Sequence, residues 1–101
     1  MNSSVIVIAS FTPKDGAEHE VEKILQGMVS PSRGEAGCTC YDLYQKEAST
    51  SFTLFESYKN QAALEEHRQT EHFKNYRAQI IELLKEPIQV NILQEINAAK
   101  R

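Results

Sequence analysis

The order of the patterned segments limits the possible folds of this chain more than any other feature of its sequence. Residues 5–11 (VIVIASF) form a short β-branched run between turn residues, which is typical of a buried strand. Residues 38–46 alternate in polarity, residues 52–58 (FTLFESY) are rich in aromatic and β-forming residues, and turn residues at 48–51 separate them. These two segments therefore predict a hairpin. The last patterned segment, residues 88–96 (IQVNILQEI), predicts a fourth strand.

Helical patterns fill the two long intervals between the predicted strands. In the first interval, apolar residues recur with the three- and four-residue spacing of an amphipathic helix. Asp15 followed by Glu18 has the chemistry of a capping box, and Pro31 predicts where this helix ends. In the second interval Asn60 and Thr70 each predict an N-cap, so this helical region is broken in two. The apolar stripes are Val21, Ile24, Leu25, Met28 and Val29 in the first helix, and Phe73, Tyr76, Ile80, Ile81 and Leu84 in the last.

The resulting order, β-α-β-β-α-β, is that of the ferredoxin-like fold, an α+β architecture with helices on one face of a four-stranded antiparallel sheet. With 101 residues the chain has room for a single domain over residues 1–101, with its core at 5–96 and a frayed tail at 97–101. The strands carry large apolar residues on both faces of the predicted sheet, such as the neighbours Val7 and Ile8. Because the helices cover only one face, we expect a second copy of the chain to cover the other in a homodimer.

The charge balance and the N-terminal segment argue against several classes of protein. Eleven Lys and Arg residues against 14 Asp and Glu residues give a net charge of −3, which argues against a nucleic-acid partner. The first apolar run is short and no Lys or Arg precedes it, so it predicts neither a signal peptide nor a membrane span. We therefore expect a cytoplasmic protein.

Two cysteines, Cys38 and Cys40, stand in a C-x-C arrangement within the second predicted strand. In a regular strand this spacing puts both side chains on one face, with Cα atoms roughly 6.5–7 Å apart. That separation is too large for an easy disulfide. In a reducing cytoplasm we expect both to be free thiols.

The sequence contains no motif for a bound nucleotide, a serine nucleophile or a zinc hydrolase, so we expect no cofactor. His67 and His72 are five residues apart rather than four, and no third or fourth ligand is evident, so we expect no metal site. His19 lies among glutamates and is expected to be solvated. Glu56 is the one carboxylate of interest, because it falls inside a predicted strand.

His67 is the histidine of most interest, because it follows Ala63 and Leu64 on the apolar side of its helix. One interpretation is a partly buried histidine that a backbone carbonyl satisfies. The other is a neutral imidazole that acts near pH 7 as a base or as a hydrogen-bond partner for a phenolic substrate. The tyrosines leave a similar choice between packing in the core and orienting a substrate oxygen. They are Tyr41, Tyr44, Tyr58 and Tyr76.

Two segments resemble the antibiotic biosynthesis monooxygenase superfamily, in particular its small quinol monooxygenases. They are residues 35–45 (EAGCTCYDLYQ) and 55–76 (FESYKNQAALEEHRQTEHFKNY), and the resemblance extends over residues 5–96. The shared pattern is Gly-Cys-x-x-Tyr-x-Leu, Glu-x-Trp or Glu-x-Tyr, Ala-Leu-x-x-His, and His-Phe before an aromatic residue. The resemblance implies a dimer of the dimeric α/β barrel type. It also implies oxidation of quinols or polyketide aromatics with O2 and without metal, flavin or haem.

The resemblance also implies an apolar pocket between the sheet and the helices, and it assigns residues to that pocket. His67 and Tyr58 match catalytic positions, and Tyr41, His72 and Phe73 match substrate-binding positions. A deprotonated dihydroxy-aromatic substrate can itself pass an electron to O2. The protein then needs to supply only the apolar pocket, a proton acceptor and donors for the resulting oxyanion.

Departures from the family pattern leave other functions open. Tyr58 stands where many members carry tryptophan, and the pair Tyr58 and Lys59 is similar to that of phospho-autoinducer isomerases. An isomerase of a small phosphorylated dicarbonyl is therefore one alternative. Haem degradation is not expected, because the first strand lacks the asparagine of the haem-degrading relatives and Tyr58 replaces their tryptophan. A non-catalytic dimeric module for ligand binding or stress response is the other alternative, which a closed interior would favour.

Overall fold

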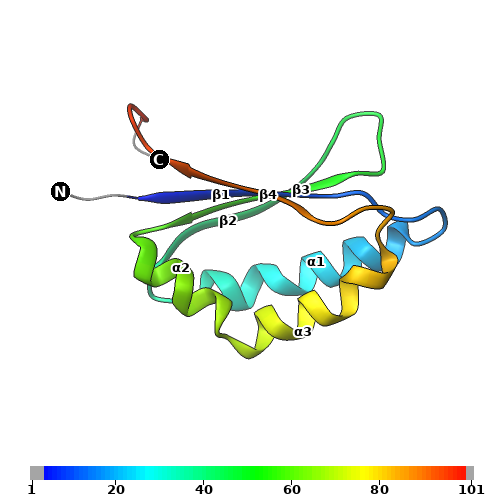
Figure 1. Cartoon of the computed structure of the whole chain (residues 1–101), viewed down its shortest axis with the longest axis horizontal. Coiled ribbons are helices and arrows are strands. Elements are labelled where there is room, and N and C mark those ends of the chain that lie inside the picture. Colours follow the sequence, from blue (N-terminus) through cyan, green and yellow to red (C-terminus); the bar gives the residue numbers. More distant parts are fainter. Residues whose placement is uncertain (1–3, 100–101) are drawn as a thin grey trace.

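The structure is a computed structural model that describes residues 4–99. Its strands are β1 (Val5–Phe11), β2 (Cys38–Gln45), β3 (Phe52–Tyr58) and β4 (Gln89–Gln94). Its helices are α1 (Glu18–Arg33), α2 (Gln61–Arg68) and α3 (Glu71–Ile80), and a 3-10 turn, η1 (Ile81–Leu83), continues the last of them. The strands form one antiparallel sheet in the order β2-β3-β1-β4, with the helices on one face (Figure 1). This arrangement confirms the predicted ferredoxin-like α+β fold.

The core lies between the two central strands and the helices. β1 pairs with β3 so that Phe11 is opposite Phe52 and Ala9 is opposite Leu54. Because side chains alternate along a strand, these four residues point to the same face, where α1 and α3 cover them. The fully buried aliphatic residues contributed by α1 and α3 are Val21, Leu25 and Ile80.

Several predicted boundaries are confirmed. β1 and β3 have the predicted limits, whereas β4 is shorter than predicted at both ends. α2 begins after Asn60, whose Oδ1 accepts a hydrogen bond from the N–H of Ala63 at 2.8 Å. α3 begins after Thr70, whose Oγ1 accepts one from the N–H of Phe73 at 3.2 Å. Both predicted N-caps are therefore present.

The prediction that Pro31 ends the first helix is wrong, because α1 continues through it to Arg33. A proline in the last turn removes only one helical hydrogen bond. Contacts with the sheet then hold this turn in place. Arg33 donates from Nε to the carbonyl of Tyr41 at 3.0 Å and from Nη2 to Asp42 at 3.0 Å.

Two further predictions about the helix ends are corrected. Asp15 does not cap α1, because its carboxylate pairs with Lys85 at 3.1 Å. The carboxylate of Glu18 instead accepts from the N–H of Gly16 at 3.1 Å. Ile81, predicted to belong to the apolar stripe of α3, is 62% exposed because the backbone tightens into η1 at this residue.

Cys38 and Cys40 do not share a face of β2, contrary to the prediction. Cys38 lies opposite Tyr58 and Cys40 lies opposite Ser57, so β2 accommodates Thr39 as an extra residue in a bulge. Cys38 therefore packs against the core, where burial raises the pKa of its thiol to about 11. Neither cysteine forms a disulfide among the described residues.

Within residues 4–99, no helix covers the face of the sheet opposite α1, α2 and α3 (Figure 1). Ile8 and Phe55 are half-buried on this face, and Leu93 of β4 is 45% exposed. The homodimer stays a prediction. Among the residues that the structure describes, no helix is long and apolar enough to span a bilayer.

Candidate active site

Five polar side chains from four segments meet at the α2 end of the interior. α2 supplies His67, and the loop between α1 and β2 supplies Glu35. The first turn of α3 supplies His72, and β3 supplies Glu56 and Tyr58. Hydrogen bonds and one longer ion pair join them. We call these five residues the His67 cluster.

His67 is buried and surrounded by rings. It lies on the inward face of α2 with Ala63 and Leu64, one turn earlier, and is 1% exposed. Ring centroids lie 5.2 Å from that of His67 for Tyr58 and Phe73, 5.8 Å for Tyr41 and 6.0 Å for His72. The predicted site residues therefore all contact one buried imidazole.

Glu35 connects the two histidines. Its carboxylate accepts hydrogen bonds from Nδ1 of His67 at 2.9 Å and from Nε2 of His72 at 2.5 Å. The partner of His67 is thus a carboxylate rather than the backbone carbonyl of the simpler interpretation. Burial lowers the pKa of His67, and the hydrogen bond to Glu35 opposes this effect only in part. A neutral ring that donates from Nδ1 leaves its lone pair on Nε2.

Gly37 lets the loop bring Glu35 to α2. A Cβ atom at Gly37 would overlap the Cβ of Ala63, so this close approach of loop and helix needs a glycine. The N–H of Lys59 donates to the carbonyl of Gly37 at 2.9 Å and ties the loop to the end of β3. Glu35 precedes His67 by 32 residues and lies outside any periodic segment, so sequence reasoning missed it.

Glu56 is a buried carboxyl group, 5% exposed. The hydroxyl of Tyr58 donates to its Oε1 at 2.7 Å. Burial raises the pKa of Glu56 to about 7, although the bond from Tyr58 and the charges of Arg77 and Arg68 act in the opposite direction. Oε1 also lies 4.0 Å from Nε2 of His67. This carboxyl group therefore exchanges its proton near neutral pH, as a general acid or base requires.

The buried hydroxyls of Tyr41 and Ser32 make no hydrogen bond of regular geometry among the described residues, and a weak interaction with Ser32 acts to lower the pKa of Tyr41. Tyr41 is 1% exposed, and its ring lies against that of His67. Burial raises the pKa of Tyr41, so the hydroxyl keeps its proton at neutral pH. A buried donor without an acceptor costs stability, which makes it a candidate for binding a ligand oxygen.

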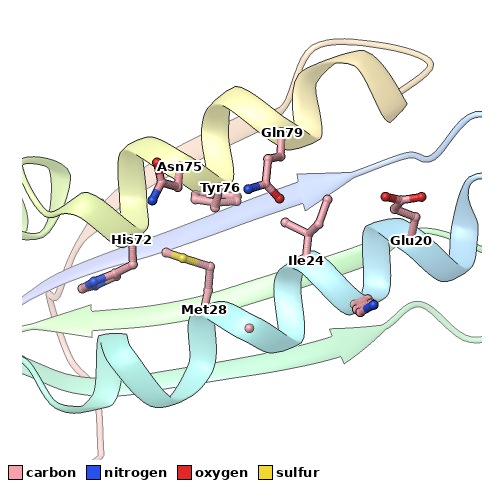
Figure 2. A pocket seen from close by; sticks show the side chains of 9 residues that line it. Glu20, Ile24, Met28, His72, Asn75, Tyr76 and Gln79 are labelled. Atoms are coloured by element: carbon pink, nitrogen blue, oxygen red, sulfur yellow. The ribbon is translucent and has the colours of Figure 1, made fainter.

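A groove of about 420 Å³ lies beside the cluster, between α1 and α3 (Figure 2). His72 and Tyr76 of α3 and Met28 of α1 are among its walls. His67 and Tyr58 line neither this groove nor three other hollows found on the described part of the chain. The two predicted catalytic residues thus lie in a closed interior, and His72 connects them to the groove.

Three members of the His67 cluster have the chemistry of metal ligands. Glu35, His67 and His72 offer one carboxylate oxygen and two imidazole nitrogens, and these atoms lie within 4.8 Å of one another. The expectation that the two histidines lack a third ligand is therefore wrong. The catalytic and substrate-binding roles of the predicted residues stay predictions.

Comparison with known proteins decides the family. Residues 4–79 match the family model described as antibiotic biosynthesis monooxygenase. The chain belongs to this family. The resemblance seen in the sequence is therefore confirmed.

Relatives within the antibiotic biosynthesis monooxygenase family match almost the whole chain. "Putative monooxygenase Rv0793" of Mycobacterium tuberculosis is 42% identical over 99 residues, which cover 98% of each protein. "Putative monooxygenase YcnE" of Bacillus subtilis is 32% identical over 87 residues, which cover 85% of this chain and 92% of that protein.

Solved structures that are similar to this chain share its fold. The structure of Rv0793 matches with a TM-score of 0.94 and 41% identity, covering 96% of this chain and 99% of that one. The structure of PA3566 from Pseudomonas aeruginosa matches with a TM-score of 0.84 and 36% identity, covering 98% of each chain. These similarities support monooxygenase as the class of this protein and leave its substrate open.

Proposed function

We propose that this protein is a cofactor-independent monooxygenase that oxidises quinol-like or polyketide aromatic substrates with O2. Membership of the antibiotic biosynthesis monooxygenase family supports the class of reaction. The observation that carries the proposal is the buried pair of titratable side chains, His67 and Glu56, whose Nε2 and Oε1 atoms lie 4.0 Å apart and which bond to Glu35 and Tyr58 respectively. A base with a pKa near neutrality can take a proton from a phenolic hydroxyl and return it later in the cycle.

The first step is removal of a proton from a substrate hydroxyl. Nε2 of His67 is the acceptor, because Nδ1 already donates to Glu35. The unpartnered hydroxyl of Tyr41 donates to the phenolate oxygen, where negative charge develops. The phenolate itself then supplies the electrons, as an electron-rich aromatic ring can.

The oxygen chemistry balances without a further reductant. The phenolate passes one electron to O2, and the resulting phenoxyl radical and superoxide combine at a ring carbon as a peroxide. Cleavage of the O–O bond leaves one oxygen atom on the ring. The other oxygen atom leaves as water, whose two hydrogens come from the substrate. A quinol thereby becomes a hydroxyquinone.

The groove between α1 and α3 is the proposed way in for the substrate. His72 lines this groove and lies against the ring of His67. Phe73 is only partly buried and covers another side of His67. We expect the side chain of Phe73 to move when a substrate reaches His67 from the groove.

Oxygen uptake tests the proposal. The full chain is dialysed against a chelator and mixed with a chemically reduced naphthoquinol, and O2 consumption is compared with that of the quinol alone. We expect uptake above the uncatalysed rate, one O2 consumed per quinol, and a hydroxyquinone by mass spectrometry. Uptake equal to autoxidation would refute the monooxygenase proposal.

The closed interior favours a second candidate, a non-catalytic ligand-binding module. His67 and Tyr58 line none of the four hollows, and this is the result expected if their cluster has only a structural role. This candidate predicts that an oxidised naphthoquinone binds to the protein while the reduced form is not consumed faster than by autoxidation. Titration calorimetry with the oxidised form and oxygen uptake with the reduced form separate the two functions.

A homodimer through the open sheet face is also proposed. Ile6, Phe55 and Leu93, together with residues 94–99, line a hollow of about 530 Å³ on this face, and no residue of the described range 4–99 fills it. We expect light scattering at micromolar concentration to give a mass near twice 11.5 kDa. Leu93→Asp should give a monomer, and Ile81→Asp, at an exposed apolar position on the helix side, should not. A monomeric wild-type protein would contradict this proposal.

A further inference from the structure

The histidines and the glutamate of the His67 cluster carry an inference that the proposed reaction does not use. The loop before β2 supplies Glu35, α2 supplies His67 and α3 supplies His72, so three separate segments converge on one point. Two imidazoles with one carboxylate form a donor set suited to Zn²⁺, Fe²⁺ and similar ions. We propose that Glu35, His67 and His72 bind one divalent transition-metal ion.

The ligand atoms are already close to the spacing that an ion needs. Oε2 of Glu35 lies 2.9 Å from Nδ1 of His67 and 2.5 Å from Nε2 of His72. A tetrahedral ion with bonds of about 2.0–2.2 Å holds neighbouring ligand atoms roughly 3.4 Å apart. The ion therefore takes the place of the two hydrogen-bonding protons, and the side chains separate from Glu35 by up to about 1 Å.

When an ion binds Nδ1 of His67, the proton on Nδ1 must leave this atom, and the ring offers it another position. In the metal-bound neutral ring it moves to Nε2, which faces Oε1 of Glu56 at a distance of 4.0 Å. The hydroxyl of Tyr58 donates to the same oxygen atom of Glu56 through a hydrogen bond of 2.7 Å. A carboxylate behind a ligating histidine commonly fixes the orientation of the ring. Glu56 is thus placed to support the metal site without binding the ion.

The site is closed on one side and open on the other. The side chain of His67 is 2% exposed, whereas those of Glu35 and His72 are 17% and 27% exposed. An ion can therefore enter past Glu35 and His72, and the protein supplies three ligands. The remaining coordination positions face the entrance, where water or a small ligand can bind.

Binding of the ion does not rest on the proposed function, because it is measured without substrate. The two are linked only through shared side chains. An ion on Nδ1 of His67 removes the hydrogen bond that Nδ1 donates to Glu35 and places the ring proton on Nε2, the proposed proton acceptor. We therefore expect the bound ion to inhibit metal-independent oxidation.

Titration of the full chain with Co²⁺ or Zn²⁺ alone tests this inference, after the chain has been dialysed against a chelator. We expect one ion per chain by calorimetry, and a visible absorption band for Co²⁺. His72→Gln changes a partly exposed side chain and should weaken binding at least about tenfold. His19→Gln, at the exposed histidine on α1, should bind as the wild type does.

Two results would overturn the inference. One is the absence of binding by the wild type at millimolar Co²⁺ and Zn²⁺. The other is unchanged binding by His72→Gln together with loss of binding by Cys40→Ser, which would assign the ion to thiolates. Glu35→Gln offers a second test of the ligand set, and circular dichroism checks that each variant is folded. Metal binding without oxygen uptake would refute the proposed function and leave the metal site. Oxygen uptake without metal binding would refute the metal site and leave the proposed function.

Discussion

The interior under the sheet has two halves of different chemistry. The half beneath α1 and the end of α3 is packed with aliphatic and aromatic residues, including Phe11, Leu25 and Ile80, each 0% exposed. The half beneath α2 buries a histidine and a carboxyl group, His67 and Glu56. Both halves share the strands β1 and β3, so the difference arises from the side chains and not from the architecture.

The comparison shows which half stabilises the fold and which half lowers its stability. Burial of apolar surface stabilises the first half by roughly 25 cal/mol per Å². Burial of an ionisable group lowers stability unless partners compensate, and replacing such a group by a neutral one often stabilises a protein. A chain of 101 residues has a small core, so a costly cluster in its interior points to function.

The largest expected effect on stability is in the apolar half. Leu25→Ala removes a fully buried side chain and should lower the free energy of unfolding by about 3–5 kcal/mol in urea denaturation. Oxygen uptake per folded molecule should be unchanged, because Leu25 belongs to the larger apolar cluster and Tyr58 of the His67 cluster belongs to the other. A loss of uptake without a loss of stability would show that the two halves do not have separate roles.

Glu56→Gln should reveal the cost of the polar half through its pH dependence. The pKa of Glu56 is raised by burial to about 7, with Glu35 adding to the effect and Tyr58, Arg77 and Arg68 opposing it. At low pH the carboxyl group is protonated in both the folded and the unfolded states. As pH rises from about 4.5 to about 7, only the unfolded state releases the proton, so the wild type loses stability. Above pH 7 this loss is about 3 kcal/mol.

In Glu56→Gln this pH-dependent loss should be absent. Urea denaturation of both proteins between pH 4.5 and 8, in the presence of a chelator, measures the difference. Glu66→Gln, at an exposed position of α2, is the control and should follow the wild type. Parallel curves for the wild type and Glu56→Gln would mean that Glu56 ionises as it does in the unfolded chain.

Tyr41→Phe should have the smallest effect on stability. The hydroxyl makes no hydrogen bond of regular geometry, so its removal should leave the free energy of unfolding unchanged or raise it by about 1 kcal/mol. The rate of quinol oxidation should fall by about tenfold to a hundredfold, because a donor to the phenolate is lost. Tyr44→Phe, at an exposed tyrosine of β2, should change neither quantity. An unchanged rate in Tyr41→Phe would remove Tyr41 from the proposed mechanism.

The fold could be predicted from the sequence because hydrophobic period and turn chemistry agree along most of the chain. The caps at Asn60 and Thr70 were predictable for the same reason, since each depends on neighbouring residues only. Pro31 and the C-x-C pair were misjudged because tertiary contacts and a strand bulge override local preference. Such effects have no signature in a single sequence.

The candidate site was predictable only in part. The resemblance to the family marked His67 and Tyr58 together with the aromatic residues, and the structure brings them into contact. Glu35 could not be found, because its position depends on the close approach of the loop at Gly37 to α2. The closure of the interior around His67 also depends on how rings from four elements pack.

The rate of oxygen uptake by His67→Gln is the most direct test of the claim that the polar half is a catalytic site. The wild type and the variant are compared in the naphthoquinol assay, with the chelator present and with circular dichroism to verify folding. We expect a fall of about 10²–10⁴-fold in the enzyme-dependent rate, because the proton acceptor is lost. A folded His67→Gln protein that oxidises the quinol as fast as the wild type would contradict the account.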